Sequence, residues 1–225
     1  MFAKGLAKEA GLDYAILTGG DIAPLGKDAV TEIHKIFDWA KTSKKGVVIF
    51  VDEADAFLRK RSTEKISEDL RNALNAFLYC TGEATNKFLL VLASNQPEQF
   101  DWAINDRLDE MIEFKLPGYD ERVKMIAMYM EKYILKPPLG SKTIIIENPD
   151  EVLALIPKLA EDTAGYSGRE ISKLAIAWQA GAYGSSDTKV TKEMLMRVLQ
   201  ENQSTKNMKK LWYSANEASN LARDS

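Results

Sequence analysis

The sequence contains very few residues that bind metals or form cross-links. Of its 225 residues, one is a cysteine, Cys80, and one is a histidine, His34. A single cysteine excludes a disulfide within the chain and is in keeping with a reducing compartment. One histidine cannot build a zinc site, and the helical spacing of apolar residues around His34 favours a helix surface over a catalytic role.

Long hydrophobic runs and a strong charge of either sign are also missing. No apolar run approaches the ~18 residues that a membrane-spanning helix needs. The net charge of -3 gives no general reason to expect nucleic-acid or anionic-membrane binding. Lys4 and Lys8 lie near the start, but Glu9 and the lack of arginine there argue against a targeting peptide. With 45% hydrophobic and 28% charged residues, the composition is that of a globular protein.

The stretch that organises the chain is an apolar strand followed by two acids. Residues 47–51 read Val-Val-Ile-Phe-Val, which is typical of a strand buried on both faces of a parallel sheet. Asp52 and Glu53 follow where the strand must end. Ligands of open α/β sheets bind beyond the carboxyl ends of the strands, so Mg²⁺ and a water to be activated suit these carboxylates. The alternative is a strand that ends in an ordinary acidic turn.

Apolar strands and amphipathic helices alternate over residues 1–118. The predicted strands are 14–17, 47–51, 88–93 and 111–114, and the predicted helices are 2–10, 28–40 and 66–78, with a helical turn at 102–105. Helices that alternate with buried strands predict an α/β fold, in which a parallel sheet has helices on both faces.

Helical patterns replace this alternation in the second half of the chain. Apolar residues recur at helical spacing in four groups, 123–130, 152–159, 171–178 and 194–199. Residues 136–149 contain three prolines and predict an extended connection, with a short strand at 144–146. We therefore expect a small helical domain over 119–205 and a polar, frayed tail over 206–225.

Two further polar residues follow the later strands. Asn95 comes directly after the second continuous apolar strand, and Arg107 lies about a dozen residues further on. A carboxylate pair and an amide at the ends of adjacent parallel strands can hold Mg²⁺ and orient a water, and an arginine can stabilise a phosphoryl transition state from this subunit or a neighbour. Taken singly, Asn95 is also a common turn residue, and Arg107 could pair with Asp106 or Asp109.

These segments together resemble those of the AAA ATPases. Residues 47–56 are similar to the Walker B strand and its continuation, and 92–97 to the sensor-one strand. Residues 103–109 resemble the arginine-finger segment, and 165–171 the lid motif beside the adenine. The resemblance implies an ATP hydrolase that uses ATP and Mg²⁺, built on a P-loop NTPase-type sheet followed by a helical lid.

The same resemblance implies a role for each candidate residue. Asp52 binds Mg²⁺ through water, Glu53 is the general base for the attacking water, and Asn95 positions that water. Arg107 reaches the γ-phosphate held by the next subunit of a ring.

The lid motif is implied to contact the adenosine through Ser167, Gly168 and Arg169. Glycine at 168 allows close approach because it has no side chain. Arg169 either adds a second phosphate contact, like a sensor-two arginine, or forms a salt bridge with Glu170 or Glu161.

Two longer stretches narrow the resemblance. Residues 52–61 and 93–107 are similar to the mitochondrial family of AAA domain-containing protein three, and the similarity runs over residues 2–183. That family implies a mitochondrial location and a part in inner-membrane and nucleoid organisation. It also implies a homo-oligomer in the form of a hexameric ring, and membrane contact through regions outside this chain.

One motif of the family has no counterpart in these residues. No segment reads G-x-x-x-x-G-K-[ST], the loop that cradles phosphates. Residues 2–7 resemble the helix that follows that loop in the family. In the family, the strand before the loop lies between the sensor-one strand and the last strand. We therefore expect that the loop and this strand lie outside the chain, and that residues 1–225 alone fold badly and bind ATP poorly.

Two smaller departures bear on the mechanism. The expected pore loop reads Pro24-Leu25-Gly26, without the aromatic residue used to grip polypeptides, and residues 103–109 contain one arginine where many AAA proteins have two. An ATP-driven mechanoenzyme and a nucleotide-gated scaffold with slow or no hydrolysis are both compatible with this pattern. Direct DNA binding would rest on the basic cluster 59–61 alone, so we do not expect it.

Overall fold

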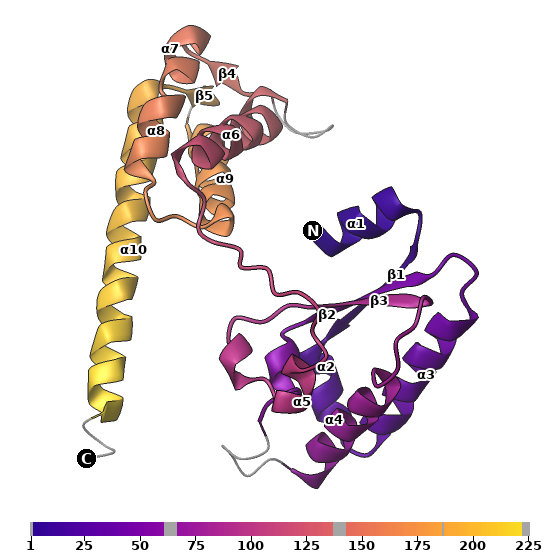
Figure 1. Ribbon diagram of the computed structural model, residues 1–225. Coiled ribbons are helices and arrows are strands. Elements are labelled where there is room, and N and C mark those ends of the chain that lie inside the picture. Colours follow the sequence, from indigo (N-terminus) through magenta and orange to yellow (C-terminus); the bar gives the residue numbers. More distant parts are fainter. Residues whose placement is uncertain (1, 61–66, 137–142, 186, 222–225) are drawn as a thin grey trace. The chain divides into compact units, whose positions relative to one another are not determined.

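A computed structural model describes residues 2–60, 67–136, 143–185 and 187–221 (Figure 1). Several predictions extend beyond these residues: Arg61 of the basic cluster, Ile66 of the predicted helix, 137–142 of the connection and 222–225 of the tail. The chain divides into two compact units, Met1–Ile112 and Glu113–Ser225, which we describe separately. The boundary that we expected at residue 118 falls in the same stretch without helix or strand as this division.

The first unit is built on a parallel sheet of β1 (Asp13–Thr18), β2 (Val47–Asp52) and β3 (Phe88–Leu92), in that order. β2 lies in the middle, and its first residue pairs with the first residue of each neighbour. Four of its apolar side chains are fully buried. The prediction of a parallel α/β sheet organised around this strand is confirmed.

Helices cover both faces of the sheet, as predicted. α3 (Asp28–Thr42) and α4 (Glu68–Cys80) pack on one face, where the rings of Phe37, Phe57 and Phe77 meet edge to face. α1 (Phe2–Ala10) packs on the other face against Val48. Short segments connect these elements: α2 (Gly19–Ile22), η1 (Ala23–Leu25), η2 (Ala54–Ala56), η3 (Pro97–Gln99) and α5 (Trp102–Asn105).

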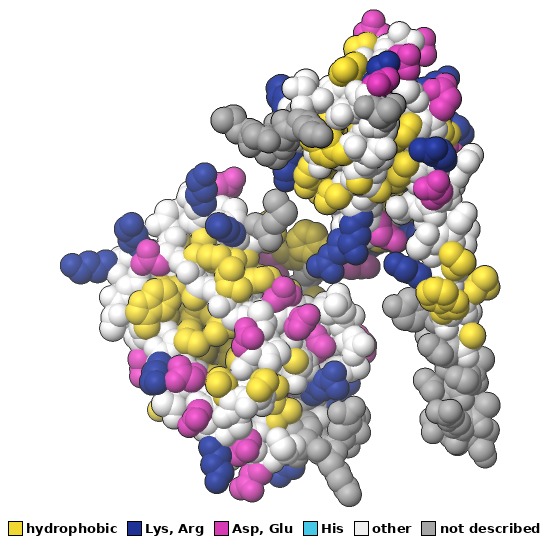
Figure 2. Space-filling view, turned by 180° about the vertical axis from the view of Figure 1, so that it is seen from behind, with side chains coloured by type: hydrophobic (Ala, Val, Ile, Leu, Met, Phe, Trp, Pro, Cys, Tyr) yellow, Lys and Arg dark blue, Asp and Glu magenta, His cyan; other side chains and the backbone are white. Residues whose placement is uncertain are grey.

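The face that carries α1 is only partly covered. The side chains on this face come from residues that pair across the three strands. Two of them, Ile16 and Leu89, are 59% and 46% exposed. Figure 2 shows hydrophobic side chains gathered on the surface of this unit. In the sheet formed by the described residues, β3 is an outer strand.

The strand predicted at 111–114 is not formed, so that prediction is wrong. Residues 111–114 have no strand assignment, and Met111, Ile112 and Phe114 are mostly exposed. An isolated strand leaves its backbone groups without partners and is not stable. The apolar pattern was present, but among the described residues it pairs with no neighbouring strand.

The second unit is a helical bundle. α6 (Tyr119–Met130) runs into the π-helical turn η4 (Glu131–Leu135), and α7 (Pro149–Ala154), α8 (Ile156–Asp162), α9 (Gly168–Gly184) and α10 (Lys192–Leu221) follow. β4 (Ile145–Ile146) pairs with β5 (Lys189–Val190), close to the predicted short strand. Trp178 is fully buried at the centre, and its Nε1 donates a hydrogen bond to the carbonyl oxygen of Leu195.

Two helices differ from their predictions. The single helix expected over 152–159 is two helices that meet at Leu155, because Pro157 cannot donate to the carbonyl group of Leu153. α10 does not end near residue 205 but continues to Leu221, and 206–221 contain neither proline nor glycine to stop it. Within the described residues, no helix is both long enough and apolar enough to cross a membrane.

A candidate nucleotide site at the strand ends

The end of β2 turns sharply and presents both predicted carboxylates to solvent. Asp52 is its last residue, and the backbone N–H of Glu53 donates to Oδ1 of Asp52 at 3.0 Å. Glu53 has φ 49° and ψ 41°, the left-handed region that side chains other than glycine rarely adopt. Such a conformation costs about 1–3 kcal/mol and persists only where the surroundings impose it.

The loop after β1 packs directly against this turn. A methyl group on Gly19 would overlap the carbonyl oxygen of Glu53, and one on Gly20 would lie 3.7 Å from Oε2 of Glu53. Thr18 accepts a hydrogen bond from the backbone of Asp21 at 3.1 Å and begins α2. The glycine at position 19 therefore allows the first loop to pack closely against the backbone of Glu53, a contact that residue patterns had not indicated.

The end of β3 is hydrogen-bonded to the same turn. Ala93 donates its N–H to Val51 at 2.9 Å and accepts one from Ala54 at 3.0 Å. The hydroxyl group of Ser94 donates to Oδ1 of Asp55 at 2.6 Å. Asn95 is the next residue and is exposed. Hydrogen bonds thus connect the acidic turn to the segment that carries Asn95, at one edge of the sheet. The sequence had not predicted the Ser94–Asp55 hydrogen bond.

Arg107 is not brought to these residues. It follows α5, is exposed, and its Nη1 donates to the carbonyl group of Ala103 at 3.3 Å. Its Nη2 lies near Gly82, in the loop that leads into the start of β3. Within the described residues, Arg107 forms no ion pair with Asp106 or Asp109, the partners that the sequence had left open.

The lid motif forms the start of α9. The side chain of Ser167 accepts from the N–H of Glu170 at 3.3 Å, and Oε2 of Glu170 accepts from the N–H of Ser167 at 2.7 Å. This reciprocal pair is a capping box, which fixes the first turn of a helix. A methyl group on Gly168 would lie 3.3 Å from Cε of Met125 on α6. Met125 is a neighbour of the lid motif that sequence reasoning missed.

Arg169 is exposed, and its two predicted ion-pair partners are engaged elsewhere. Glu170 pairs with Lys206 at 2.9 Å, and Glu161 lies 3.7 Å from Lys158. In the part of the chain that the structure describes, Arg169 therefore forms neither of the two salt bridges that the sequence had left open.

The donor set suits Mg²⁺ bound together with a nucleotide better than a resident metal ion. Among the residues that the structure describes, no three His, Cys, Asp or Glu side chains gather into a metal site. Mg²⁺ is commonly held by one or two carboxylates, with waters and substrate phosphates as its remaining ligands. A single carboxylate, Asp52, oriented by the N–H of Glu53, fits that use.

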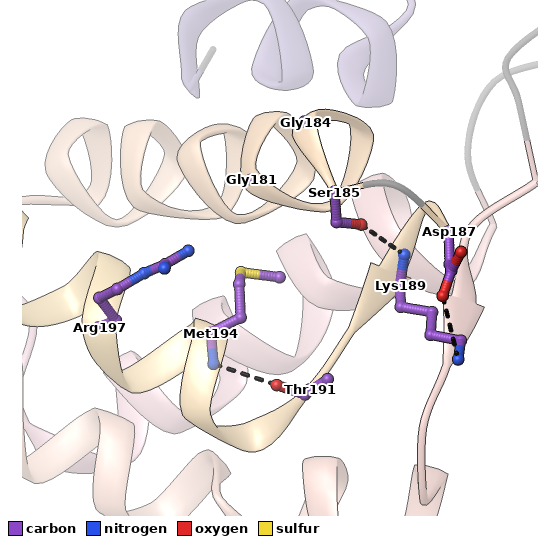
Figure 3. Close-up of a pocket in the computed structure, with 8 residues that line it drawn as sticks. All are labelled: Gly181, Gly184, Ser185, Asp187, Lys189, Thr191, Met194 and Arg197. Atoms are coloured by element: carbon purple, nitrogen blue, oxygen red, sulfur yellow. Dashed lines mark hydrogen bonds and ion pairs between the residues drawn. The ribbon is translucent and has the colours of Figure 1, made fainter.

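A hollow of about 270 Å³ lies elsewhere, in the helical unit between the end of α9 and the start of α10 (Figure 3). Lys189 pairs with Asp187 at 3.5 Å and donates its N–H to Ser185, while Met194 donates its N–H to Thr191. The hollow is lined by Gly181, Gly184, Ser185, Asp187, Lys189, Thr191, Met194 and Arg197. None of the predicted site residues lines it.

Comparison with known proteins defines the class of this chain. The family model described as "ATPase family associated with various cellular activities (AAA)" matches residues 1–116. The chain therefore belongs to the AAA family.

The curated relatives are more specific. The chain is 54% identical over 225 residues to ATPase family AAA domain-containing protein 3 of Xenopus tropicalis, which is 100% of this chain and 38% of that protein. It is 54% identical over 215 residues to ATPase family AAA domain-containing protein 3A of Homo sapiens, covering 96% of this chain and 37% of that protein. The match to the 3A homolog of Drosophila melanogaster is 58% identical over 197 residues and covers 87% and 32%. The chain thus spans about a third of the length of these relatives.

Proposed function

We propose that this chain supplies the hydrolytic side of an ATP site in a longer mitochondrial AAA ATPase. The observation that carries the proposal is the edge of the sheet where the Glu53 turn and the Asn95 segment are joined by the Ser94–Asp55 hydrogen bond. Membership of the AAA family supports the enzyme class.

The chemistry follows from the residues at that edge. Glu53 accepts the proton of the attacking water, and Asn95 hydrogen-bonds that water and orients it. Asp52 would hold Mg²⁺ through a water. When it is bound with ATP, Mg²⁺ neutralises the charge that develops on the phosphates.

The site is completed by other parts of the assembly. Arg107 is exposed, and among the residues that the structure describes it pairs with neither Asp106 nor Asp109; it would reach the γ-phosphate on the next subunit of a hexameric ring. Ser167, Gly168 and Arg169 would contact the adenosine. The phosphate-cradling loop is not found in residues 1–225, so we expect these residues alone to bind ATP weakly.

Replacement of Glu53 tests the proposal. In the full-length protein, Glu53→Gln should abolish turnover and leave ATP bound, because the carboxamide cannot accept the proton of water. Steady-state hydrolysis and retention of labelled ATP measure the two effects. Glu98→Gln makes the same charge change at another exposed position and should leave both unchanged. Turnover at the wild-type rate in Glu53→Gln would remove Glu53 as the base.

A nucleotide-gated scaffold is a second candidate, favoured by the expected pore loop Pro24-Leu25-Gly26, which lacks an aromatic residue, and by the single arginine in residues 103–109. In this case ATP binding drives assembly, and the assembly organises the mitochondrial inner membrane or nucleoid through regions of the longer protein. Cells that depend on the Glu53→Gln protein and retain normal mitochondria would favour the scaffold. Loss of mitochondrial organisation in those cells would favour the mechanoenzyme.

A further inference from the structure

A lysine far from the lid motif in sequence is bonded to it in space. Lys206 lies on α10, and its Nζ donates to the carbonyl oxygen of Gly165 at 2.7 Å. The same ammonium pairs with Oε1 of Glu170 at 2.9 Å and lies 4.1 Å from the ring centroid of Tyr166. Its side chain is 19% exposed, well below the other ion-paired lysines of the described residues.

The three contacts of Lys206 lie between Gly165 and Glu170, in the turn that leads into α9 and in the first turn of that helix. Gly165 has φ +74°, Tyr166 is buried, and Glu170 closes the capping box at the start of α9. The two carboxylate oxygens of Glu170 have different partners: Oε2 accepts a hydrogen bond from the N–H of Ser167, and Oε1 accepts one from Lys206. The ammonium therefore connects Gly165 in the turn to Glu170 at the start of α9, and a cation over an aromatic face adds a further attraction.

The charge balance at Glu170 agrees with this geometry. Partial burial alone would raise the pKa of Glu170, but the hydrogen bonds from the Ser167 backbone and from Lys206 outweigh burial and lower the pKa. The carboxylate thus stays ionised beside its ammonium partner at neutral pH.

We propose that Lys206 is a positioning residue for nucleotide binding, which holds the Gly165–Gly168 turn in the shape that contacts the adenosine. The inference rests on the proposed function, since that function assigns Ser167 and Gly168 to the nucleotide. A turn that is ordered before binding avoids the entropy cost of ordering it on binding. The loss of Lys206 should therefore weaken nucleotide binding without touching the chemistry at Glu53.

The test uses the full-length protein and three variants of lysines on α10. Lys206→Met keeps the length of the side chain and removes its hydrogen bonds, and it should raise the KM for ATP and the Kd for ADP about fivefold while kcat stays within about twofold. Lys206→Arg keeps the charge and should recover much of the affinity. Lys209→Met changes an exposed lysine nearby and should leave both constants at wild-type values.

Hydrogen exchange in nucleotide-free protein supplies a second readout. In Lys206→Met, the amides of 165–170 should exchange faster than in wild type, while those of the sheet unit should not change. If Lys206→Met does not fold, Glu170→Gln weakens the same contact and should produce the same rise in KM. The proposal is overturned if the turn loosens but nucleotide affinity does not fall, if exchange does not change, or if kcat falls as much as affinity.

The outcomes separate this inference from the function on which it rests. Wild-type turnover that depends on Glu53, together with an unchanged KM and Kd in Lys206→Met, sinks only the inference about Lys206. A wild-type protein that neither binds nor hydrolyses ATP sinks both.

Discussion

At the scale of single residues, the strain at Glu53 is the most informative feature of the site. Its left-handed backbone is unfavourable for a glutamate, yet it places the side chain at the edge where the strands end. Gly19 packs against its carbonyl group and leaves no room for a side chain. The turn is therefore held by its neighbours and not by the preferences of its own residues.

This close contact predicts the effect of a small substitution. Gly19→Ala should destabilise the sheet unit by about 1–3 kcal/mol, because the new methyl group overlaps the backbone of Glu53. It should also reduce turnover, since the carboxylate is displaced. Denaturant unfolding and ATP hydrolysis measure these effects. Gly5→Ala, in α1 with nothing within 4 Å, is the matched control and should be neutral or slightly stabilising.

The lowered pKa of Glu170 predicts a dependence on pH. A carboxyl group whose pKa is lower in the folded state contributes stability at a pH above its unfolded pKa, and the contribution is lost as pH falls through the folded value. The helical unit should therefore lose stability as pH falls below the ordinary value of 4.5. Urea unfolding at several pH values, followed by pulsed hydrogen exchange of the α9 amides, measures this loss of stability.

Two variants complete the pH experiment. Glu170→Gln cannot ionise and should flatten this part of the pH profile, whereas Glu151→Gln, at an exposed position on α7, should leave the wild-type slope. An unchanged slope in Glu170→Gln would mean that other groups govern the acid response.

At the scale of secondary structure, α10 combines a packed part and an extended part. Leu195, Val198 and Leu199 belong to the core of the helical unit, and Lys206 contacts the lid turn. Beyond that point, Leu211 and Trp212 are exposed. The two parts should differ greatly in what they contribute to stability.

A pair of proline substitutions tests this difference. Leu211→Pro should unwind the outer part of α10 and lower helicity, but shift the melting temperature by less than about 2 °C, because this part contributes little to the core. Leu195→Pro should unfold the helical unit. Circular dichroism and thermal unfolding measure both. A large shift in Leu211→Pro would show that the outer part is bound to the rest of the molecule.

The elements also show what the sequence could predict and what it could not. The three strands of the sheet were predictable, because continuous apolar runs such as 47–51 have few other uses. The segment 111–114 is apolar except for Glu113 and is not a strand, since pairing depends on a neighbour that no local pattern reveals. The contact of Lys206 with Gly165 lies beyond any spacing rule, because it joins residues 41 positions apart.

At the scale of the whole molecule, the chain consists of two units that each have a hydrophobic core. The core around Phe37 and Phe77 lies within the sheet unit, and the core around Trp178 lies within the helical unit. The candidate residues are divided between these units in the same way. Asp52, Glu53, Asn95 and Arg107 belong to the sheet unit, and Ser167, Gly168 and Arg169 belong to the helical unit.

The ring that we propose predicts complementation between subunits. Arg107→Ala alone and Glu53→Gln alone should each abolish turnover in the full-length protein, because every interface then lacks one group. In randomly mixed rings, about a quarter of the interfaces join an intact Glu53 to an intact Arg107, and turnover should partly return. ATP hydrolysis after mixing and reassembly measures it. Mixed rings without activity would place Arg107 and Glu53 at the same nucleotide, within one subunit.

The partly covered face of the sheet has a practical consequence for work with these 225 residues. Ile16 on β1 and Leu89 on β3 expose apolar surface on this face, and β3 is an outer strand of the described sheet. Exposed apolar surface next to a strand edge promotes aggregation and precipitation when the protein is concentrated. The substitution Leu89→Lys should raise the concentration at which the protein stays soluble. For the unmodified chain, detergent or a partner that covers this face should have the same effect.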